Sequence, residues 1–197
     1  MASPAPLKSP GLQPDDWILA AFARLSAEGI DAVRIEVLAR ELRVSKGSFY
    51  WHFQDREELV GKMLSRWEVE EFEWLDAVSA ADHSPAARWA RFVERYSEPA
   101  RARVLVGIHS WARRDAAVAA RITALESRRA RFIAEVLAEI GLSRSAADSW
   151  SELVQYVWLG WLDRATREDA APSGSRSLAD VLSELIRAAS AQSAASR

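Results

Sequence analysis

The chain of 197 residues contains no cysteine. This absence excludes disulfides, thiolate catalysis and cysteine-based zinc sites, and it fits a reducing cytoplasm. The few histidines lie far apart, and neither an HExxH motif nor a glycine-rich phosphate loop occurs. We therefore predict no metal site, no cofactor and no catalytic residues, and we do not expect an enzyme.

Long apolar runs are also absent, although 49% of the residues are hydrophobic. Such a composition is typical of a globular protein, and without a run of about 18 apolar residues no membrane-spanning helix is predicted. Residues 1–14 are rich in proline and lack an apolar core segment, which favours a flexible arm over a signal peptide. No alternating apolar and polar run is long enough for a strand. We expect an all-α, cytoplasmic protein.

Two short helices joined by a tight turn are predicted within residues 35–53. The first carries an apolar stripe with helical spacing at Ile35, Leu38, Ala39 and Leu42. Ser45 is placed to cap the second helix, and Val44 and Phe49 have the spacing of a hydrophobic staple. This pattern indicates a helix-turn-helix, whose second helix enters the DNA major groove.

The same residues resemble the signature of the TetR family of bacterial transcriptional regulators. That signature has an apolar residue and Ala on the first helix, Gly-Val-Ser or Gly-Val-Thr in the turn, Tyr-x-His-Phe on the second helix, and then Lys and Leu. The corresponding residues here are Leu38-Ala39, Arg43-Val44-Ser45, Tyr50, His52-Phe53, Arg56 and Leu59. The resemblance is specific over roughly residues 15–66 and implies a DNA-binding domain there.

Three positions depart from the family pattern. Arg43 replaces the turn glycine, and a left-handed backbone at a residue with a side chain would cost about 1 kcal/mol. Arg34 stands where the first helix often starts with threonine; it cannot cap the helix but can reach a phosphate. Arg56 replaces the usual lysine and keeps a cation for the DNA backbone.

The net charge of −2 is unusual for a nucleic-acid binder. A local basic face is nevertheless enough for phosphate contact, and cations gather around the second helix. Lys46 and Ser48 are predicted to meet bases or phosphates, and Trp51 either contacts the sugar-phosphate edge or packs over it. The full set of predicted DNA-binding residues is Arg34, Arg43, Ser45, Lys46, Gly47, Ser48, Tyr50, Trp51, His52 and Arg56.

The rest of the chain has helical periodicity throughout, and nine helices fit the pattern. Residues 15–66 form the predicted DNA-binding domain, and residues 67–193 form an effector-binding and dimerisation domain. A long helix starting at Asp55 would join the two domains. Gly29 is placed to end the first helix and Asp115 to cap a later one.

The last two helices have wide apolar stripes, which suit an antiparallel pair that forms a four-helix bundle with a symmetry mate. TetR-like proteins pair through these helices, so the resemblance favours a homodimer. The alternative is that the stripes close the core of a single chain. The predicted interface residues are Trp150, Leu153, Val157, Trp161, Leu178, Val181, Leu182 and Leu185.

Aromatic residues are concentrated in the middle of the chain. A pocket lined by them would suit a small, largely apolar or aromatic effector, and the family's effector cavity lies in the same helices. By residue type alone, a packed helical core is the better interpretation of these side chains. The candidate effector-binding residues are Trp67, Trp74, Trp89, Phe92, Tyr96, His109, Trp111 and Trp158.

These observations predict a ligand-responsive transcriptional repressor that binds a palindromic DNA operator. An effector that favours a different tilt of the long helix would release the operator, and the sequence leaves open the opposite sign, in which the effector is a co-repressor. The alternative function is a helical ligand-binding or protein-interaction module that never meets DNA.

Overall fold

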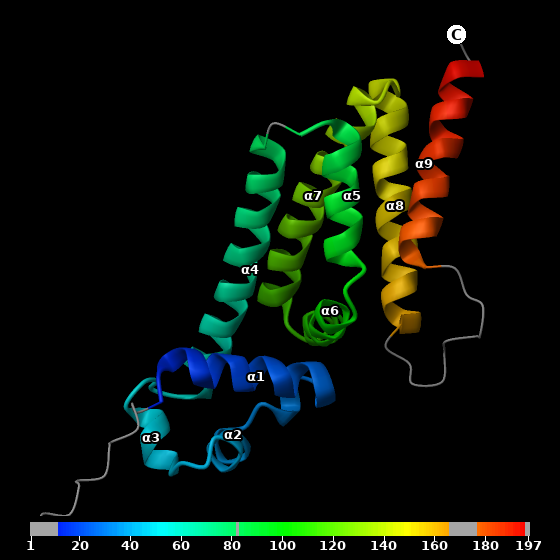
Figure 1. The fold of residues 1–197 in the computed structure, drawn as a ribbon. Coiled ribbons are helices and arrows are strands. Elements are labelled where there is room, and N and C mark those ends of the chain that lie inside the picture. The colour runs from blue at the N-terminus through cyan, green and yellow to red at the C-terminus, as the bar shows by residue number, and fades with distance from the viewer. Residues whose placement is uncertain (1–11, 82, 166–176, 196–197) are drawn as a thin grey trace, which may run out of the picture. The chain divides into compact units, whose positions relative to one another are not determined.

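The computed structural model describes residues 12–81, 83–165 and 177–195, and among these residues it contains no strand. The all-α prediction is confirmed, with nine α-helices and one short 3-10 helix, η1, in the described part (Figure 1). Residues 1–11 of the expected arm lie outside the described residues. The elements are α1 (Pro14–Glu28), η1 (Ile30–Ala32), α2 (Ile35–Glu41), α3 (Lys46–Tyr50), α4 (Arg56–Ala80), α5 (Pro85–Tyr96), α6 (Pro99–Ala112), α7 (Ala116–Glu139), α8 (Arg144–Ala165) and α9 (Leu178–Ala195).

The chain divides into two compact units, with the boundary between Arg66 and Trp67. The first unit contains α1, η1, α2, α3 and the first part of α4. The second contains the rest of α4 and helices α5 to α9. Because α4 is one continuous helix, it contributes residues to both units.

An apolar core holds the first unit together. Trp17 of α1 and Phe49 of α3 are fully buried, and their ring centroids lie 5.2 Å apart in edge-to-face contact. Phe53 stacks on Phe49 with its centroid also at 5.2 Å. Burying each such side chain stabilises the fold by about 1.5–3 kcal/mol. This core therefore determines where α3 lies within the unit.

Two turns in the first unit have a left-handed backbone. Gly29 ends α1 with φ 84°, which confirms the predicted glycine cap. Arg43, between α2 and α3, has φ 57°, so the arginine at the family's glycine position occupies the conformation that glycine adopts most easily. The predicted cap at Ser45 is wrong, because its side chain makes no capping hydrogen bond. Its backbone carbonyl instead accepts a hydrogen bond from the Ser48 N–H at 3.0 Å.

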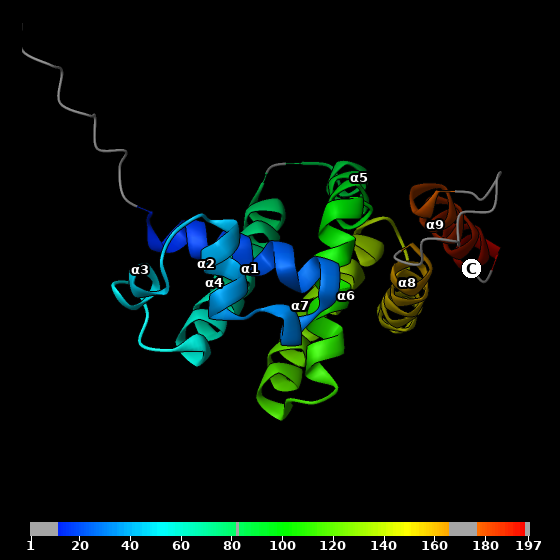
Figure 2. The ribbon, with the colours of Figure 1, turned by 90° about the horizontal axis from the view of Figure 1, so that it is seen from below.

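In the second unit, α5, α7, α8 and α9 run alongside one another and α6 lies across them (Figure 1). Helix α7 packs against α5, α6 and α8, while α9 packs against α5 and α8. Figure 2 shows α9 beside α8 at the edge of this unit. Asp115 caps α7 by accepting hydrogen bonds from the N–H groups of Ala117 and Val118, as the sequence predicted.

Candidate DNA-binding helix and ligand cavity

Helix α3 and the turn after it have one buried and one exposed side. Phe49 and Phe53 are buried, whereas Tyr50 is 59% exposed and Trp51 is 87% exposed. The two phenylalanines anchor the helix, so the two aromatic residues between them face outward. Among the other predicted contacts in this segment, the exposed residues are Ser45, Lys46 and Gly47, and the half-buried residues are Ser48 and His52.

The cations around α3 differ in whether they form an ion pair within the protein. Arg34 and Arg43 are exposed and form no ion pair within the described part of the chain. Lys46 forms an exposed ion pair with Glu36 of α2. A hydrogen bond from Lys46 lowers the pKa of Glu36, so Glu36 stays ionised at neutral pH. A DNA phosphate would therefore compete with Glu36 for Lys46.

Arg56 has a structural role that the sequence did not predict. Its Nε–H donates to the carbonyl oxygen of Val33 at 2.6 Å, and its Nη2 donates to that of Ile30 at 2.7 Å. The planar guanidinium suits two acceptors at once, which a lysine ammonium at the same place does less well. Because two of its nitrogens are engaged at η1, Arg56 serves the fold of the first unit, and the phosphate contact expected of it loses support.

The aromatic residues predicted to bind an effector pack mainly on one another in the second unit. The Phe92 ring centroid lies 4.5 Å from that of Tyr96 and 5.7 Å from that of Trp89. The Trp74 centroid lies 5.8 Å from that of Tyr96, and the indole N–H of Trp158 donates to the Tyr96 carbonyl at 3.0 Å. The structure thus places these side chains in a packed core, the alternative that the sequence left open.

A buried charge cluster lies beside this aromatic core and joins α4 to α5, α6 and α7. Glu71 of α4 has no exposed surface and accepts hydrogen bonds from the Tyr96 hydroxyl at 2.7 Å, Arg95 at 2.9 Å and Arg101 at 2.5 Å. Arg129 of α7 donates to the same carboxylate at 3.3 Å. Burial raises the pKa of Glu71, but these partners lower it more, so its pKa lies below the usual value. One carboxylate thus faces three guanidiniums.

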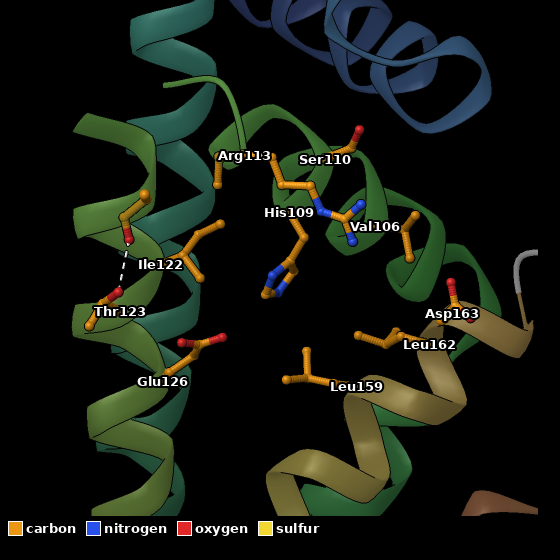
Figure 3. A pocket seen from close by; sticks show the side chains of 12 residues that line it. Val106, His109, Ser110, Arg113, Ile122, Thr123, Glu126, Leu159, Leu162 and Asp163 are labelled. Atoms are coloured by element: carbon orange, nitrogen blue, oxygen red, sulfur yellow. Dashed lines mark hydrogen bonds between the residues drawn. The ribbon is translucent and has the colours of Figure 1, made fainter. Parts of the chain in front are cut away.

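A cavity of about 570 Å³ lies among α6, α7 and α8 in the second unit (Figure 3). Pockets for small molecules commonly have this size, with mostly apolar walls and a few polar groups. The larger apolar side chains of its wall are Val106, Ile122, Leu159 and Leu162. The His109 ring points into the centre of the cavity, with Arg113 beside it and Glu126 of α7 on the opposite wall.

The polar side chains of the cavity have unusual surroundings. The Nε2 atom of His109 is buried without a hydrogen-bond partner in the described structure. Burial, together with the charges of Arg129 and Arg113, lowers the pKa of His109 to about 4. Burial also raises the pKa of Glu126, although Arg129 opposes that shift. The imidazole is therefore uncharged at neutral pH, and the protonated form of Glu126 is favoured more than in water.

Of the eight predicted effector-binding residues, His109 alone lines this cavity. Trp67 is buried and Trp111 is half-buried, and neither belongs to its wall. Sequence reasoning missed Arg113 and Glu126. An arginine one helical turn after a histidine on an otherwise apolar face was a signal for Arg113. Nothing in the sequence pattern pointed to Glu126, which the packing of α7 against α6 brings to the cavity.

The predicted dimer residues fall into two groups. Leu178 and Leu182 of α9 are 2% and 0% exposed in the single chain, because α9 uses that face to pack on α5 and α8. The structure therefore removes them from the candidate interface. On α8, Leu153 is 40% exposed, and its neighbour Tyr156, which the sequence analysis did not select, is 67% exposed. The other predicted residues with described side chains are the half-buried Trp150, Val157, Trp161 and Val181; the side chain of Leu185 lies outside the described residues.

Among the described residues, no group of three or more His, Asp or Glu side chains could hold a metal ion. Likewise, none of the helices in that part of the chain has the length and apolar character needed to cross a membrane.

Comparison with known protein families gives one match in the first unit. The model described as bacterial regulatory proteins, tetR family, matches residues 18–63, which include α2, the turn and α3. This part of the chain therefore carries the DNA-binding domain of the TetR family. Proteins of this family are DNA-binding transcriptional regulators, not enzymes.

Solved structures of several transcriptional regulators share the fold of this chain. A transcriptional regulator from Rhodococcus sp. Rha1 is 16% identical, with a TM-score of 0.68 over 92% of this chain and 96% of the other. A regulator of the TerR/AcrR family from Aquifex aeolicus VF5 is also 16% identical, with a TM-score of 0.64 over 89% and 96%. The ketosteroid transcriptional regulator of Mycobacterium tuberculosis is 16% identical, with a TM-score of 0.59 over 93% and 96%. A search of curated proteins finds no match.

Proposed function

We propose that this TetR-family regulator is a cytoplasmic repressor that binds a palindromic operator as a homodimer and is released by a small, largely apolar or aromatic effector. The outward side of α3 is the observation that carries the proposal. Tyr50 and Trp51 are exposed there, whereas Phe49 and Phe53 beneath them are buried. A rigid segment with exposed aromatic and cationic groups suits contact with the sugar-phosphate backbone and with base edges.

The exposed apolar side of α8 supports a dimer. Leu153 and Tyr156 lie one helical turn apart and are well exposed in the single chain. A second copy of the chain would cover them by an isologous contact, in which the same patch is used twice. A two-fold axis would then present α3 twice, to half-sites about one turn of DNA apart or slightly more.

The cavity of the second unit supports an effector response. Arg129, whose charge acts on His109 and Glu126, also binds Glu71 of α4, and α4 continues without a break into the first unit. A ligand that prefers a different position of α4 would shift the dimer toward a state that does not fit the operator. A preference of about 1.4 kcal/mol is enough for a tenfold change in operator affinity.

The DNA-binding part of the proposal is tested by selecting bound duplexes from a random pool and titrating the winner at several salt concentrations. A palindromic winner is expected. In the Gly47→Leu variant, a side chain would occupy the space on α3 meant for DNA, and selection should fail. A β-carbon at Gly47 comes no closer than 3.5 Å to its surroundings, and one at Gly61 of α4 meets nothing within 4 Å. Gly61→Leu is therefore the matched control, and equal selection by both variants would contradict the proposal.

The dimer is tested by sedimentation of Leu153→Glu. A carboxylate in the centre of the apolar patch should give a monomer, because burying an unpaired charge is costly. Ser145→Glu places the same charge at an exposed position near the start of α8 and should leave the dimer intact. A persistent dimer of Leu153→Glu with unchanged operator affinity would place the interface elsewhere.

A further inference from the structure

The polar end of the cavity is formed by two nitrogen-bearing side chains, those of His109 and Arg113. His109 and Arg113 are one helical turn apart at the end of α6, and both reach into the cavity (Figure 3). The opposite wall is mainly apolar and includes Ile122 and Leu159. A ligand in this space would therefore have an apolar body and one polar end near the two nitrogen-bearing groups.

The Nε2 atom of His109 and the guanidinium of Arg113 are both available to a ligand. The buried Nε2 of His109 makes no hydrogen bond in the described structure, and an unsatisfied buried polar atom is costly. Arg113 is exposed at the mouth of the cavity and forms no ion pair within the residues that the structure describes. A ligand oxygen placed between them would satisfy both, and an anionic oxygen would satisfy the arginine best, since charge-assisted hydrogen bonds are the stronger kind.

The charges behind the cavity also favour an anion. Arg129 belongs to the cluster in which three guanidiniums surround the carboxylate of Glu71. Its charge, with that of Arg113, acts on His109. The acidic groups on the cavity wall are Glu126 of α7 and Asp163 of α8. Burial favours the protonated form of Glu126, and Asp163 is exposed, where solvent screens its charge.

We propose that the cavity binds a small monocarboxylate with an apolar body, and that the carboxylate lies between His109 and Arg113. This inference rests on the proposed function, which makes the cavity the effector site, and it adds the chemical class of the effector. A bound carboxylate raises the pKa of Glu126 further, which favours the protonated form that can donate a hydrogen bond to the ligand.

Binding of the carboxylate should weaken as pH rises. In the free protein His109 is uncharged at neutral pH, because its pKa is about 4. A bound carboxylate favours the imidazolium and raises this pKa, so binding takes up a proton and weakens as pH rises. The groups that face His109 are Arg113 at the C-terminal cap of α6, Glu126 and Arg129 on α7, and Asp163 on α8. Any proton that Glu126 takes up acts in the same direction, so the His109→Gln variant is needed to separate the two.

The test compares naphthoate, naphthylmethanol and naphthylmethylamine, which share one ring system and differ in the charge of the polar group. Titration calorimetry of the full chain in buffers with different ionisation enthalpies measures both affinity and proton uptake. Naphthoate should bind at least about tenfold more tightly than the alcohol or the amine, because hydrogen bonds to a charged group are worth more than 1.4 kcal/mol. Equal or tighter binding of the amine, or no binding of naphthoate, would overturn the proposal.

Variants locate the carboxylate within the cavity. Arg113→Met should weaken naphthoate binding about tenfold and leave the alcohol unchanged, whereas Arg103→Met, at an exposed position of α6 outside the cavity wall, should change neither. His109→Gln should reduce proton uptake. Glu126→Gln keeps a hydrogen-bond donor and should bind naphthoate as tightly as the natural chain or more tightly; a weaker complex would contradict the role of Glu126 as a neutral donor to the carboxylate. Circular dichroism confirms that each variant is folded.

The effector response and the carboxylate site can each be disproved without the other. If naphthoate binds as expected but does not release the selected duplex, the ligand class stands and the effector response fails. If the duplex is instead released by an apolar compound without a carboxylate, while naphthoate does not bind, the effector response stands and the carboxylate site is wrong.

Discussion

The two units of this protein place their charged side chains differently. In the first unit, Lys46, Arg34 and Arg43 are exposed around α3, and the core beneath them is apolar. In the second unit, Glu71 and Arg129 are buried in the interior. Substitutions on the surface of the first unit should therefore change DNA binding with little effect on stability. Substitutions of buried charges in the second unit should change stability first.

The largest effect is expected for Glu71→Gln. This change leaves three buried or half-buried guanidiniums without their shared carboxylate, which should lower the free energy of unfolding by about 3–5 kcal/mol. Urea unfolding measures the loss. Glu68→Gln removes the half-exposed partner of Arg121 and should cost less than about 1 kcal/mol. If the two variants were equally stable, the buried cluster would not distinguish the second unit from the first.

Glu71 also predicts how stability depends on pH. Its pKa is lowered in the folded protein, whereas in the unfolded chain a glutamate has a pKa of about 4.3. The stabilisation is therefore complete above the unfolded pKa and is lost as the pH falls through the folded pKa. In acid, Glu71→Gln should lose less stability than the natural chain does. If the free energy of unfolding fell equally with pH in the two proteins, the lowered pKa of Glu71 would be contradicted.

Arg56→Ala should have the next largest effect, on the stability of the first unit. The variant loses two hydrogen bonds to backbone carbonyls, which we expect to cost about 1–3 kcal/mol. The salt dependence of operator binding should not change, because the guanidinium serves the fold. Arg56→Lys keeps the charge but loses the planar fork, so it should show part of the stability loss. A flatter salt dependence in Arg56→Ala would restore the phosphate contact that the sequence predicted.

Arg43→Gly should stabilise the protein by about 1 kcal/mol, because the left-handed backbone at this position costs glycine less than arginine. Arg40→Gly, in α2, is the opposite control and should destabilise by about 1 kcal/mol, because glycine is a poor helix residue. Thermal unfolding of the two variants gives the comparison. A loss of stability in both would mean that the Arg43 side chain makes a larger contribution than its backbone strain.

Lys46→Ala should have the smallest effect on stability, within about 0.5 kcal/mol, since the residue is exposed. Operator affinity should fall, and the salt slope should decrease by about one phosphate contact. Lys62→Ala removes an exposed cation from α4 and serves as the matched control. Footprints and salt slopes that are the same for both variants would exclude Lys46 from the DNA contacts.

Sequence reasoning was most accurate where the signals were local. The helix-turn-helix, the cap at Asp115 and the glycine end of α1 depend on residues within a few positions of one another, and the structure confirms them. The capping role of Ser45 failed, because a suitable residue type does not ensure that the side chain turns toward the helix.

The sequence by itself determined the all-α class and the helix-turn-helix with its family motif, because periodicity, caps and a contiguous motif are properties of neighbouring residues. The tertiary structure decided which aromatic residues form the core, where the cavity lies and which charges are buried. Glu71 meets Arg95, Arg101 and Arg129 from helices far apart along the chain. Their meeting depends on how whole helices pack, and no spacing in the sequence records that packing.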